Sequence, residues 1–512
     1  MLAAMPLPPT TTPSGDETPV RGRDDACPGA LRLHPADDGS LARIRVPGGL
    51  LTARQAVALG RLAGELGDGR LDITSRGNLQ VRGLDTGCGA ELATRLRAAG
   101  LLPSDRHDRV RNIVASPLSG LDGGGHADVV AWVRKLDALL CDDTPAGGGE
   151  LSGLSGLSGR FLFALDDGRG DVAALGADVT LIATPDGGAV LRVGGPPPGP
   201  DAPSPSTGAA RPDAAGRRGS RTAGSAVGGG LRVRGEDAPR AAALAAVEFL
   251  AKAGESGTRV WRVRELPARH AVTTEGLAAR LTDAGVEAVP VEHEPAPRAR
   301  ATPPDPGPIP GPDGRHALSV ALPLGRVSAA QWRLLAALAS RSGAAELRMT
   351  PWRGVVLPGF APHDTRGALA ELSDAGLVTT PDSPWLGVGA CTGRPGCAKS
   401  LADVRADTAR MVADPALRTS GTGRGAADPA PGASGPAWSD PLPVYVSGCE
   451  RRCGHPGGRW VDALATGDTD YRVTVRGARE DTPEADSADS VHSVDVTAEQ
   501  LAGAVAAARG TT

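Results

Sequence analysis

The chain has 512 residues, enough for two to four domains with buried cores. Its formal net charge is only −4, so the overall charge does not indicate a nucleic acid or an anionic membrane surface as a partner. No run of about 18 apolar residues occurs, so no transmembrane helix is predicted.

The seven cysteines are unevenly spaced. Cys27, Cys88 and Cys141 stand singly, whereas the other four form two tight pairs, which is not the pattern of a secreted disulfide framework. Residues 1–26 are rich in Pro, Thr and Asp and lack the basic and apolar regions of a signal peptide, so they are predicted to be a disordered tail. These features predict a reducing, cytoplasmic setting.

Stretches rich in Pro, Gly and Ser divide the chain. They are predicted to be flexible tails, linkers or insertions, and they cover residues 1–26, 144–159, 196–230, 293–315 and 418–438. The ordered blocks between them run over about 27–143, 160–292, 316–385 and 386–512.

The first and third blocks repeat one another. Each has a strand, a short turn and then a helix that begins at a hydroxyl residue with Gln three positions later. These pairs, Thr52 with Gln55 and Ser328 with Gln331, are capping boxes. The two helix starts lie 276 residues apart. The repeat predicts two equivalent folding units.

Each unit continues in the same order after its first helix. A strand is expected at Leu71–Thr74 and at Glu346–Thr350, followed by Arg76-Gly77 or Arg353-Gly354, a second strand and a second helix. The second helices end at Gly100 and Gly376, where glycine suits a left-handed cap. The order of strand, helix, strand, strand and helix suits half of an α+β sandwich. Two such halves would create a cleft for a large ligand at their interface.

The paired cysteines follow the pattern C-x5-C and C-x3-C. They are Cys391, Cys397, Cys449 and Cys453. Four thiolates are the ligand set of a [4Fe-4S] cluster. Structural zinc is an alternative, although its usual spacing is C-x2–4-C, and unrelated thiols are another. The spacing alone leaves the three open.

Several motifs together resemble the siroheme sulfite and nitrite reductases. C-x5-C followed by C-x3-C resembles their cluster signature. Three arginine motifs resemble theirs as well: Arg43-Ile-Arg45-Val-Pro-Gly-Gly, Thr74-Ser-Arg76-Gly-Asn-Leu-Gln80 and Arg111-Asn112-Ile-Val-Ala-Ser-Pro-Leu. The resemblance implies an α+β, duplicated nitrite/sulfite reductase-like fold. It would have two ferredoxin-like half-domains and two α/β cluster or substrate domains, related by pseudo-two-fold symmetry.

The same resemblance assigns the blocks. Residues 27–143 would hold the first ferredoxin-like half-domain and the entry to the first reductase-like domain, which continues over 160–292. Residues 293–315 would be a linker, 316–385 the second half-domain and 386–512 the [4Fe-4S] domain.

Within this superfamily, four segments resemble the precorrin-3B synthase family more closely. They are Ala26-Cys27-Pro-Gly-Ala-Leu31, Arg160-Phe161-Leu-Phe-Ala-Leu-Asp166-Asp167-Gly168, Ala390-Cys391-Thr-Gly-Arg-Pro-Gly-Cys397-Ala with Ala406-Asp407-Thr408, and Val446-Ser447-Gly448-Cys449-Glu-Arg-Arg-Cys453-Gly-His455-Pro456. The resemblance implies a monooxygenase of aerobic cobalamin (vitamin B12) biosynthesis. Such an enzyme hydroxylates precorrin-3A with O2 and closes a lactone from an acetate arm.

The chain also departs from the reductase pattern at two places. Siroheme reductases carry a P-R-K-F-K-like stretch, but here the stretch is Ser158-Gly159-Arg160-Phe161-Leu162, with leucine at the second lysine position. This difference argues against sulfite or nitrite reduction, which stays as an alternative. Arg451-Arg452 replaces the Asn-Gly or Lys-Gly often found between the last two cysteines.

The resemblance also implies the site residues. Arg43, Arg45, Arg76 and Arg111 would bind the carboxylates of a tetrapyrrole substrate, and Arg82 and Arg109 flank them. The four paired cysteines would bind the [4Fe-4S] cluster. His455 is a candidate ligand or proton donor.

The cofactors and partners follow from these assignments. The sequence leaves open whether siroheme, as in a heme-binding relative, or a mononuclear iron is also bound. No dinucleotide fingerprint between a strand and a helix is found, so a separate electron donor, an NADH-linked reductase or a ferredoxin, is expected. A non-catalytic iron-sulfur electron-transfer protein is a further alternative.

Overall fold

The computed structural model describes residues 25, 27–142, 149–194, 229–291, 302–419, 441–477 and 493–510. The predicted tail apart from Asp25, and nearly all of the predicted insertions at 196–230 and 418–438, lie outside these residues. Among the described helices, none is long and apolar enough to cross a membrane.

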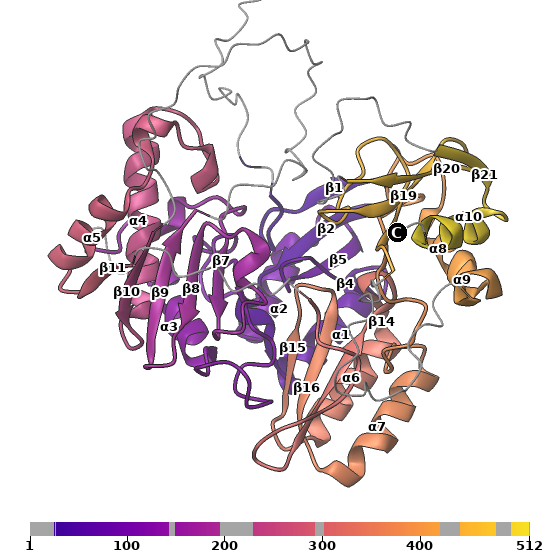
Figure 1. The fold of residues 1–512 in the computed structure, drawn as a ribbon, viewed down its shortest axis with the longest axis horizontal. Coiled ribbons are helices and arrows are strands. Elements are labelled where there is room, and N and C mark those ends of the chain that lie inside the picture. The colour runs from indigo at the N-terminus through magenta and orange to yellow at the C-terminus, as the bar shows by residue number, and fades with distance from the viewer. Residues whose placement is uncertain are drawn as a thin grey trace, which may run out of the picture.

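Two five-stranded sheets form the centre of the molecule (Figure 1). The first has the order β1-β2-β5-β4-β14, and the second has the order β12-β13-β16-β15-β3. The strands of the first copy are β1 (His34–Ala36), β2 (Gly39–Ile44), β3 (Leu50–Thr52), β4 (Arg70–Ile73) and β5 (Leu79–Leu84). Those of the second are β12 (Gly307–Pro310), β13 (His316–Ala321), β14 (Arg326–Ser328), β15 (Glu346–Met349) and β16 (Gly354–Phe360).

The two copies exchange one edge strand each. Strand β3 pairs with β15 of the second copy, and β14 pairs with β4 of the first, both antiparallel. The helices of both copies share one hydrophobic core. They are α1 (Ala53–Leu66), α2 (Gly89–Ala98), α6 (Ala329–Arg341) and α7 (Pro362–Asp374). The exchange and the common core make the repeat one pseudo-symmetric unit, as predicted.

Local sequence explains how these helices begin and pack. Both predicted capping boxes are present, at Thr52 and at Ser328. Gly100 and Gly376 adopt the predicted left-handed conformation, with φ of 69° and 81°. Helices α1 and α6 pack closely at Gly60, where the absence of a side chain leaves room for Trp332. A Cβ atom on Gly60 would lie only 2.9 Å from the Trp332 ring.

A third sheet follows the first copy, in the order β11-β10-β9-β8-β7-β6. Its strands are β6 (Ile113–Ala115), β7 (Phe163–Asp166), β8 (Val179–Ala183), β9 (Gly188–Val193), β10 (Gly230–Arg234) and β11 (Ala288–Val291). Helices α3 (Val130–Leu140), α4 (Ala238–Ser256) and α5 (Thr274–Asp283) pack with it in a second core. We call this the acidic-loop domain, after residues 166–171.

A fourth sheet follows the second copy, in the order β17-β18-β19-β20-β21. Its strands are β17 (Val388–Ala390), β18 (Val444–Ser447), β19 (Trp460–Ala465), β20 (Asp470–Arg476) and β21 (Ser493–Thr497). Its helices are α8 (Val404–Ala413), α9 (Pro415–Thr419) and α10 (Leu501–Arg509). We call this the cysteine-loop domain, because it carries all four paired cysteines.

The third and fourth sheets have matching topology. Strands β6, β7 and β8 are parallel, and so are β17, β18 and β19. An antiparallel strand follows in each, β9 or β20. The two domains lie at opposite sides of the central sheets in Figure 1. The predicted fold, with two half-domains and two α/β domains in a pseudo-two-fold arrangement, is confirmed.

Two predicted flexible stretches are partly ordered. Strand β12 lies inside the predicted linker 293–315 and pairs with β13. Leu154 and Leu157, in the predicted stretch 144–159, are buried in the core of the acidic-loop domain. The Gly, Ser and Pro content of these stretches concealed short segments that pack against the rest of the chain.

Candidate functional site

The first central sheet has one polar face opposite the shared core. Arg43, Gln80, Asp72 and Arg326 form a row across β2, β5, β4 and β14, because each is the Cα partner of the next. Their chain neighbours, such as Ile44 and Leu79, belong to the core. Successive side chains of a strand alternate between faces, so the four polar side chains share the other face. Arg43 Nη2 donates to Gln80 Oε1 at 3.4 Å.

Three of the predicted arginines gather at the β2 end of this face. Arg45 is buried and donates to Gly159 O at 2.9 Å and to Asn112 Oδ1 at 3.3 Å. Arg43, Arg45 and the half-buried Arg76 form no ion pair with any carboxylate in the part of the chain that the structure describes. The Cys27 thiol, which accepts from Arg45 Nη2 at 3.3 Å, lies among them.

The charges in this arginine group repel one another. Burial lowers the pKa of Arg76 to about 9, and the nearby guanidiniums of Arg262 and Arg45 act in the same direction. The pKa of Arg45 is also lowered, by burial and by Arg43, although Cys27 opposes this effect. Guanidiniums held together without carboxylates favour an anionic ligand, because such a ligand would relieve both the repulsion and the loss of solvation.

The acidic-loop domain adds two arginines that sequence reasoning did not place in the site. Arg262 is the largest charge acting on Arg76 and is itself held by Asp178 at 2.5 Å. The Arg160 guanidinium stacks on the Trp261 ring at 4.4 Å from the centroid. Arg160 lies within a segment that the sequence singled out, whereas Arg262 lies in no recognised motif.

Arg111 must be removed from the predicted carboxylate-binding set. Its Nε and Nη2 bind the two Asp137 oxygens, each at 2.7 Å, and its Nη1 donates to Leu101 O at 3.1 Å. The Asp137 carboxylate and the Leu101 carbonyl together occupy all three guanidinium nitrogens. Arg109 lies at the edge of the group and pairs with Asp25 at 3.8 Å.

The four paired cysteines converge at one edge of the cysteine-loop domain. Cys391 directly follows β17, and one residue, Gly448, separates Cys449 from the end of β18. Because β17 and β18 are parallel, their carboxyl ends meet at the same edge. Burial raises the pKa of Cys391, and Cys449 and Cys453 raise it further. The pKa of Cys453 is raised by burial and then by Cys449. The thiols therefore form one electrostatic group.

The spacing of these thiols distinguishes between the metal sites that the sequence left open. All four cysteines are described, and no three of their sulfurs lie within 4.8 Å of one another. A tetrahedral zinc ion with bonds of about 2.3 Å would hold its sulfurs less than about 4 Å apart. A [4Fe-4S] cluster binds each thiolate to a different iron and holds them further apart. The Gly448 amide also donates to Cys391 Sγ at 3.2 Å. The spacing of the thiols therefore does not match a tetrahedral zinc site.

Direct contacts join the cysteine loop to the polar face. Arg82, two residues after Gln80 in β5, donates to Gly396 O at 2.9 Å and pairs with Asp38 at 2.7 Å. Asp37 accepts a hydrogen bond from the Ala398 amide, next to Cys397. The hairpin between β1 and β2 thus fixes the loop over the same face as Arg43. Arg82, which the sequence placed near substrate, instead holds this loop.

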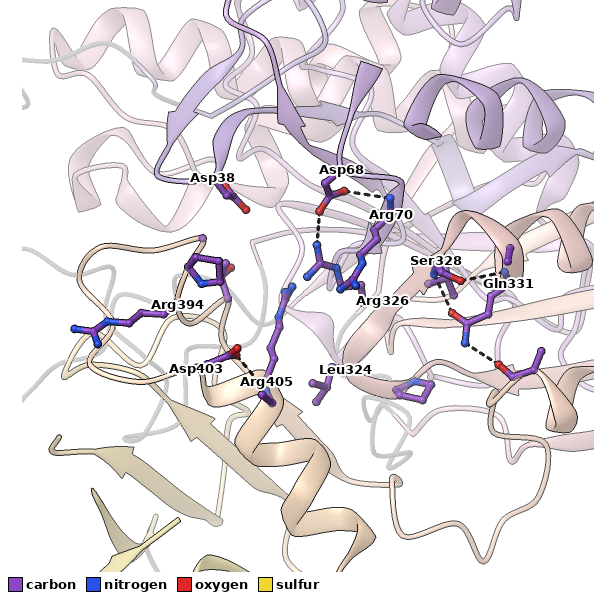
Figure 2. A pocket seen from close by; sticks show the side chains of 18 residues that line it. Asp38, Asp68, Arg70, Leu324, Arg326, Ser328, Gln331, Arg394, Asp403 and Arg405 are labelled. Carbon is purple, nitrogen blue, oxygen red and sulfur yellow. Dashed lines mark hydrogen bonds and ion pairs between the residues drawn. The ribbon is translucent and has the colours of Figure 1, made fainter. Parts of the chain in front are cut away.

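A cavity of about 930 Å³ adjoins the other end of the polar row (Figure 2). Strands β4 and β14 of the first central sheet, the start of α6 and the cysteine loop line it. Figure 2 shows Arg405 reaching from α8 toward Arg326 and Asp68. Arg326 pairs with Asp68 at 2.6 Å, and Arg405 lies 3.4 Å from Asp72. Because these charges already compensate one another, the cavity differs from the unpaired arginine group.

The residues around the last cysteine have packing roles. The His455 ring stacks on Trp460 at 5.0 Å between centroids, and its Nδ1 lies 2.8 Å from Pro456 O. Arg452, where glycine is often found, has a φ of 44°. Its guanidinium binds Asp462 at 2.6 Å and Glu450 at 2.5 Å. These two carboxylates explain how arginine is accommodated there, and a catalytic role for His455 stays a prediction.

Comparison with known proteins tests the repeat directly. The family model of the nitrite/sulfite reductase ferredoxin-like half domain matches residues 34–99 and 309–375. The chain carries this half domain twice. Both matches fall on the two repeat units, from β1 to α2 and from β12 to α7.

Similar proteins extend the likeness beyond the half domains. A precorrin-3B synthase of Sinorhizobium sp is 25% identical over 475 residues, which cover 90% of this chain and 85% of that protein. A ferredoxin–nitrite reductase of Synechococcus elongatus is 39% identical over 131 residues, only 25% of each protein. The solved structure of the Mycobacterium tuberculosis NirA protein has the same fold, with a TM-score of 0.60, 20% identity and coverage of 90% of this chain and 79% of that one. The chain thus resembles precorrin-3B synthase and has the nitrite/sulfite reductase superfamily fold.

Proposed function

We propose that this chain is an oxidoreductase of the precorrin-3B synthase type that uses a [4Fe-4S] cluster bound by Cys391, Cys397, Cys449 and Cys453. It would hydroxylate precorrin-3A and close a lactone from an acetate arm. One atom of O2 would enter the product and the other would leave as water, with two electrons and two protons from a separate donor. The donor would be a ferredoxin or an NADH-linked reductase, and the setting cytoplasmic.

One observation carries this proposal. Arg43, Arg45 and Arg76 gather on the face over which the cysteine loop is fixed, and none of them pairs with a carboxylate among the described residues. Precorrin-3A carries many acetate and propionate arms, and planar guanidinium forks bind carboxylates in two-point contacts that set both charge and orientation. Arg262 of the acidic-loop domain would border the bound arms, although Asp178 already pairs with it. The arginine group would therefore hold the ring by its arms.

The cluster would supply single electrons beside the bound ring. Cys453 is the exposed thiol of the four, so we propose that it faces the tetrapyrrole. The protein's own task is to orient the ring, because a positioned reactant needs far less rearrangement to reach the transition state.

A siroheme sulfite or nitrite reductase is the second candidate, since several relatives carry those names. One position speaks against it. Leu162, where such reductases have a lysine, is buried with Val114 and Ala164 and packs near Trp352. A lysine there would lose its solvation among these apolar side chains, so the surroundings of Leu162 favour an apolar side chain. A non-catalytic electron-transfer protein would leave the unpaired arginines unexplained.

The decisive experiment is turnover of the purified protein. The anaerobically reconstituted chain is mixed with precorrin-3A, O2 and a chemical reductant, and the product is analysed by mass spectrometry. We expect a product with one added oxygen atom. Unchanged substrate, or a purified protein with the visible bands of siroheme and sulfite-reducing activity, would reject the proposal.

A matched pair of variants tests the arginine group. Arg76→Gln is expected to weaken precorrin-3A binding about 10- to 100-fold, the effect of losing one hydrogen bond to a charged group. Arg61→Gln, on the exposed surface of α1, should bind normally. Equal affinities of the two variants, each with full iron content, would show that the site is misplaced.

A further inference from the structure

Arg353 occupies the repeat position of Gly77, because the two turns have matching hydrogen bonds 276 residues apart: the Gly77 amide donates to Thr74 O, and the Arg353 amide donates to Thr350 O. In the first copy, Gly77 takes the left-handed conformation, with a φ of 66°, whereas in the second copy Arg353 itself has a φ of 64°. A residue with a Cβ atom is strained in this conformation. The surrounding structure must therefore hold Arg353 in place.

The side chain of Arg353 reaches into the cysteine-loop domain. A Cβ atom on Gly454, the residue after Cys453, would lie 3.5 Å from Arg353 Nη2, and one on Gly389 would lie 3.8 Å from Nη1. The same two Cβ atoms would lie 2.8 Å and 2.9 Å from Tyr445. Glycine at both positions leaves room for the guanidinium and the phenol. Within the described residues, Arg353 has no ion pair with a carboxylate.

Tyr445 links Arg353 to the last cysteine. It is buried on β18, and its hydroxyl donates to Cys453 O at 2.6 Å. The Arg353 guanidinium lies beside the same phenol, because a Cβ atom on Gly454 would approach both Tyr445 Oη and Arg353 Nη2. The Tyr445 ring also packs edge-on against Trp460, at 6.3 Å between centroids. A chain of contacts thus runs from the second half domain to the turn of Cys453.

We propose that Arg353 is a positioning residue that fixes the Cys453 turn through Tyr445 and places an uncompensated positive charge beside the iron-sulfur cluster. Reduction adds negative charge to a cluster, so a nearby cation stabilises the reduced state and raises the reduction potential. The two copies of the repeat would then have different roles. Arg76 serves the substrate, and Arg353 serves the cluster. This inference rests on the cluster of the proposed function.

The test measures the reduction potential of the anaerobically reconstituted full chain by redox titration followed by electron paramagnetic resonance. Arg353→Gln is expected to shift the potential to a more negative value, because it removes the charge. Arg353→Lys should keep most of the wild-type potential. Arg341→Gln, an exposed arginine of the same half domain paired with Glu371, should leave the potential unchanged.

Variants of the protein's two tyrosines test the contact between Tyr445 and the Cys453 turn. Tyr445→Phe removes the hydrogen bond to Cys453 O and is expected to change the resonance signal of the reduced cluster. Tyr471→Phe is the control, because Tyr471 binds Asp407 elsewhere in the same domain. Loss of iron from Arg353→Gln, but not from Arg353→Lys or Arg341→Gln, would also support positioning.

The outcomes separate this inference from the proposed function. If Arg353→Gln and Tyr445→Phe both keep full iron content, potential and signal, the inference is overturned while the cluster stands. If the wild-type chain binds zinc or no metal, the cluster itself is rejected, and the inference fails with it.

Discussion

The acidic-loop and cysteine-loop domains carry different side chains at equivalent places in their sheets, carboxylates in the first and thiols in the second. Each begins with parallel strands whose carboxyl ends meet at one edge. After β6 and β7 come Ser116 and the acidic residues Asp166, Asp167 and Asp171, whereas Cys391 and Cys449 follow β17 and β18. The three carboxylates have oxygens within 4.8 Å of one another, but no three of the paired sulfurs do.

The acidic residues of this loop find hydrogen-bond partners within the acidic-loop domain. Asp166 accepts hydrogen bonds from four backbone amides, those of Gly168, Gly170, Val172 and Ala173. Asp167 pairs with Arg169 at 2.8 Å, and Asp171 accepts from Ser116 Oγ at 2.6 Å. This loop closes on itself without an added group. In the cysteine loop, the Gly448 amide donates to Cys391 Sγ, and the bound cluster stays a prediction.

The largest effect is expected in the cysteine loop. Cys449→Ala removes one of four cluster ligands and should abolish the brown visible absorbance and nearly all of the bound iron. Cys88→Ala, which changes a thiol outside the site, should keep both. Iron content and the visible spectrum check this pair of variants. A Cys449→Ala protein that keeps its full absorbance would contradict the ligand assignment.

In the acidic loop the corresponding change should affect stability and not the cofactor. Asp166→Ala leaves four amides without their acceptor in a buried loop, which should lower the free energy of unfolding by about 3 kcal/mol or more. Asp105→Ala, which breaks an exposed pair with Arg97, should cost less than about 1 kcal/mol. Urea denaturation measures both values. If Asp166→Ala lost as much iron as Cys449→Ala, the proposed difference in role between the two loops would be wrong.

The features that sequence predicted correctly depend on residues close together in the chain. The capping box of Thr52 and Gln55 spans three positions, and the cap at Gly100 depends on one residue. Their recurrence 276 residues later revealed the duplication. The cysteine pairs were found for the same reason, because each pair lies in one short loop.

The features that sequence missed depend on distant partners. Arg111 appeared available for substrate, but Asp137 on α3 binds it. The exchanged strands β3 and β14 have three residues each, too few for an alternating pattern. Arg353 looked like a copy of Arg76, and its contact with Tyr445 exists only because the cysteine-loop domain folds against the second half domain. Local pattern cannot predict such pairings.

The smallest effect concerns the pH response of the acidic loop. Burial, together with the charges of Asp166 and Asp167, raises the pKa of Asp171 to about 7, although the hydrogen bond from Ser116 opposes the shift. The unfolded carboxyl has a pKa near 3.8. Between these values the folded chain holds a proton that the unfolded chain has released. The stability contributed by this proton is therefore fully present below about pH 4 and is lost as the pH rises through about 7.

Asp171→Asn should remove this dependence, because asparagine does not titrate and its carbonyl can still accept from Ser116. Between about pH 5 and pH 8, the free energy of unfolding of the wild type should fall by about 2 kcal/mol more than that of the variant. Urea denaturation at several pH values measures the difference, in which the other titrating groups cancel. Parallel pH profiles would show that the folded loop holds Asp171 ionised, and the two loops would then differ less than the structure indicates.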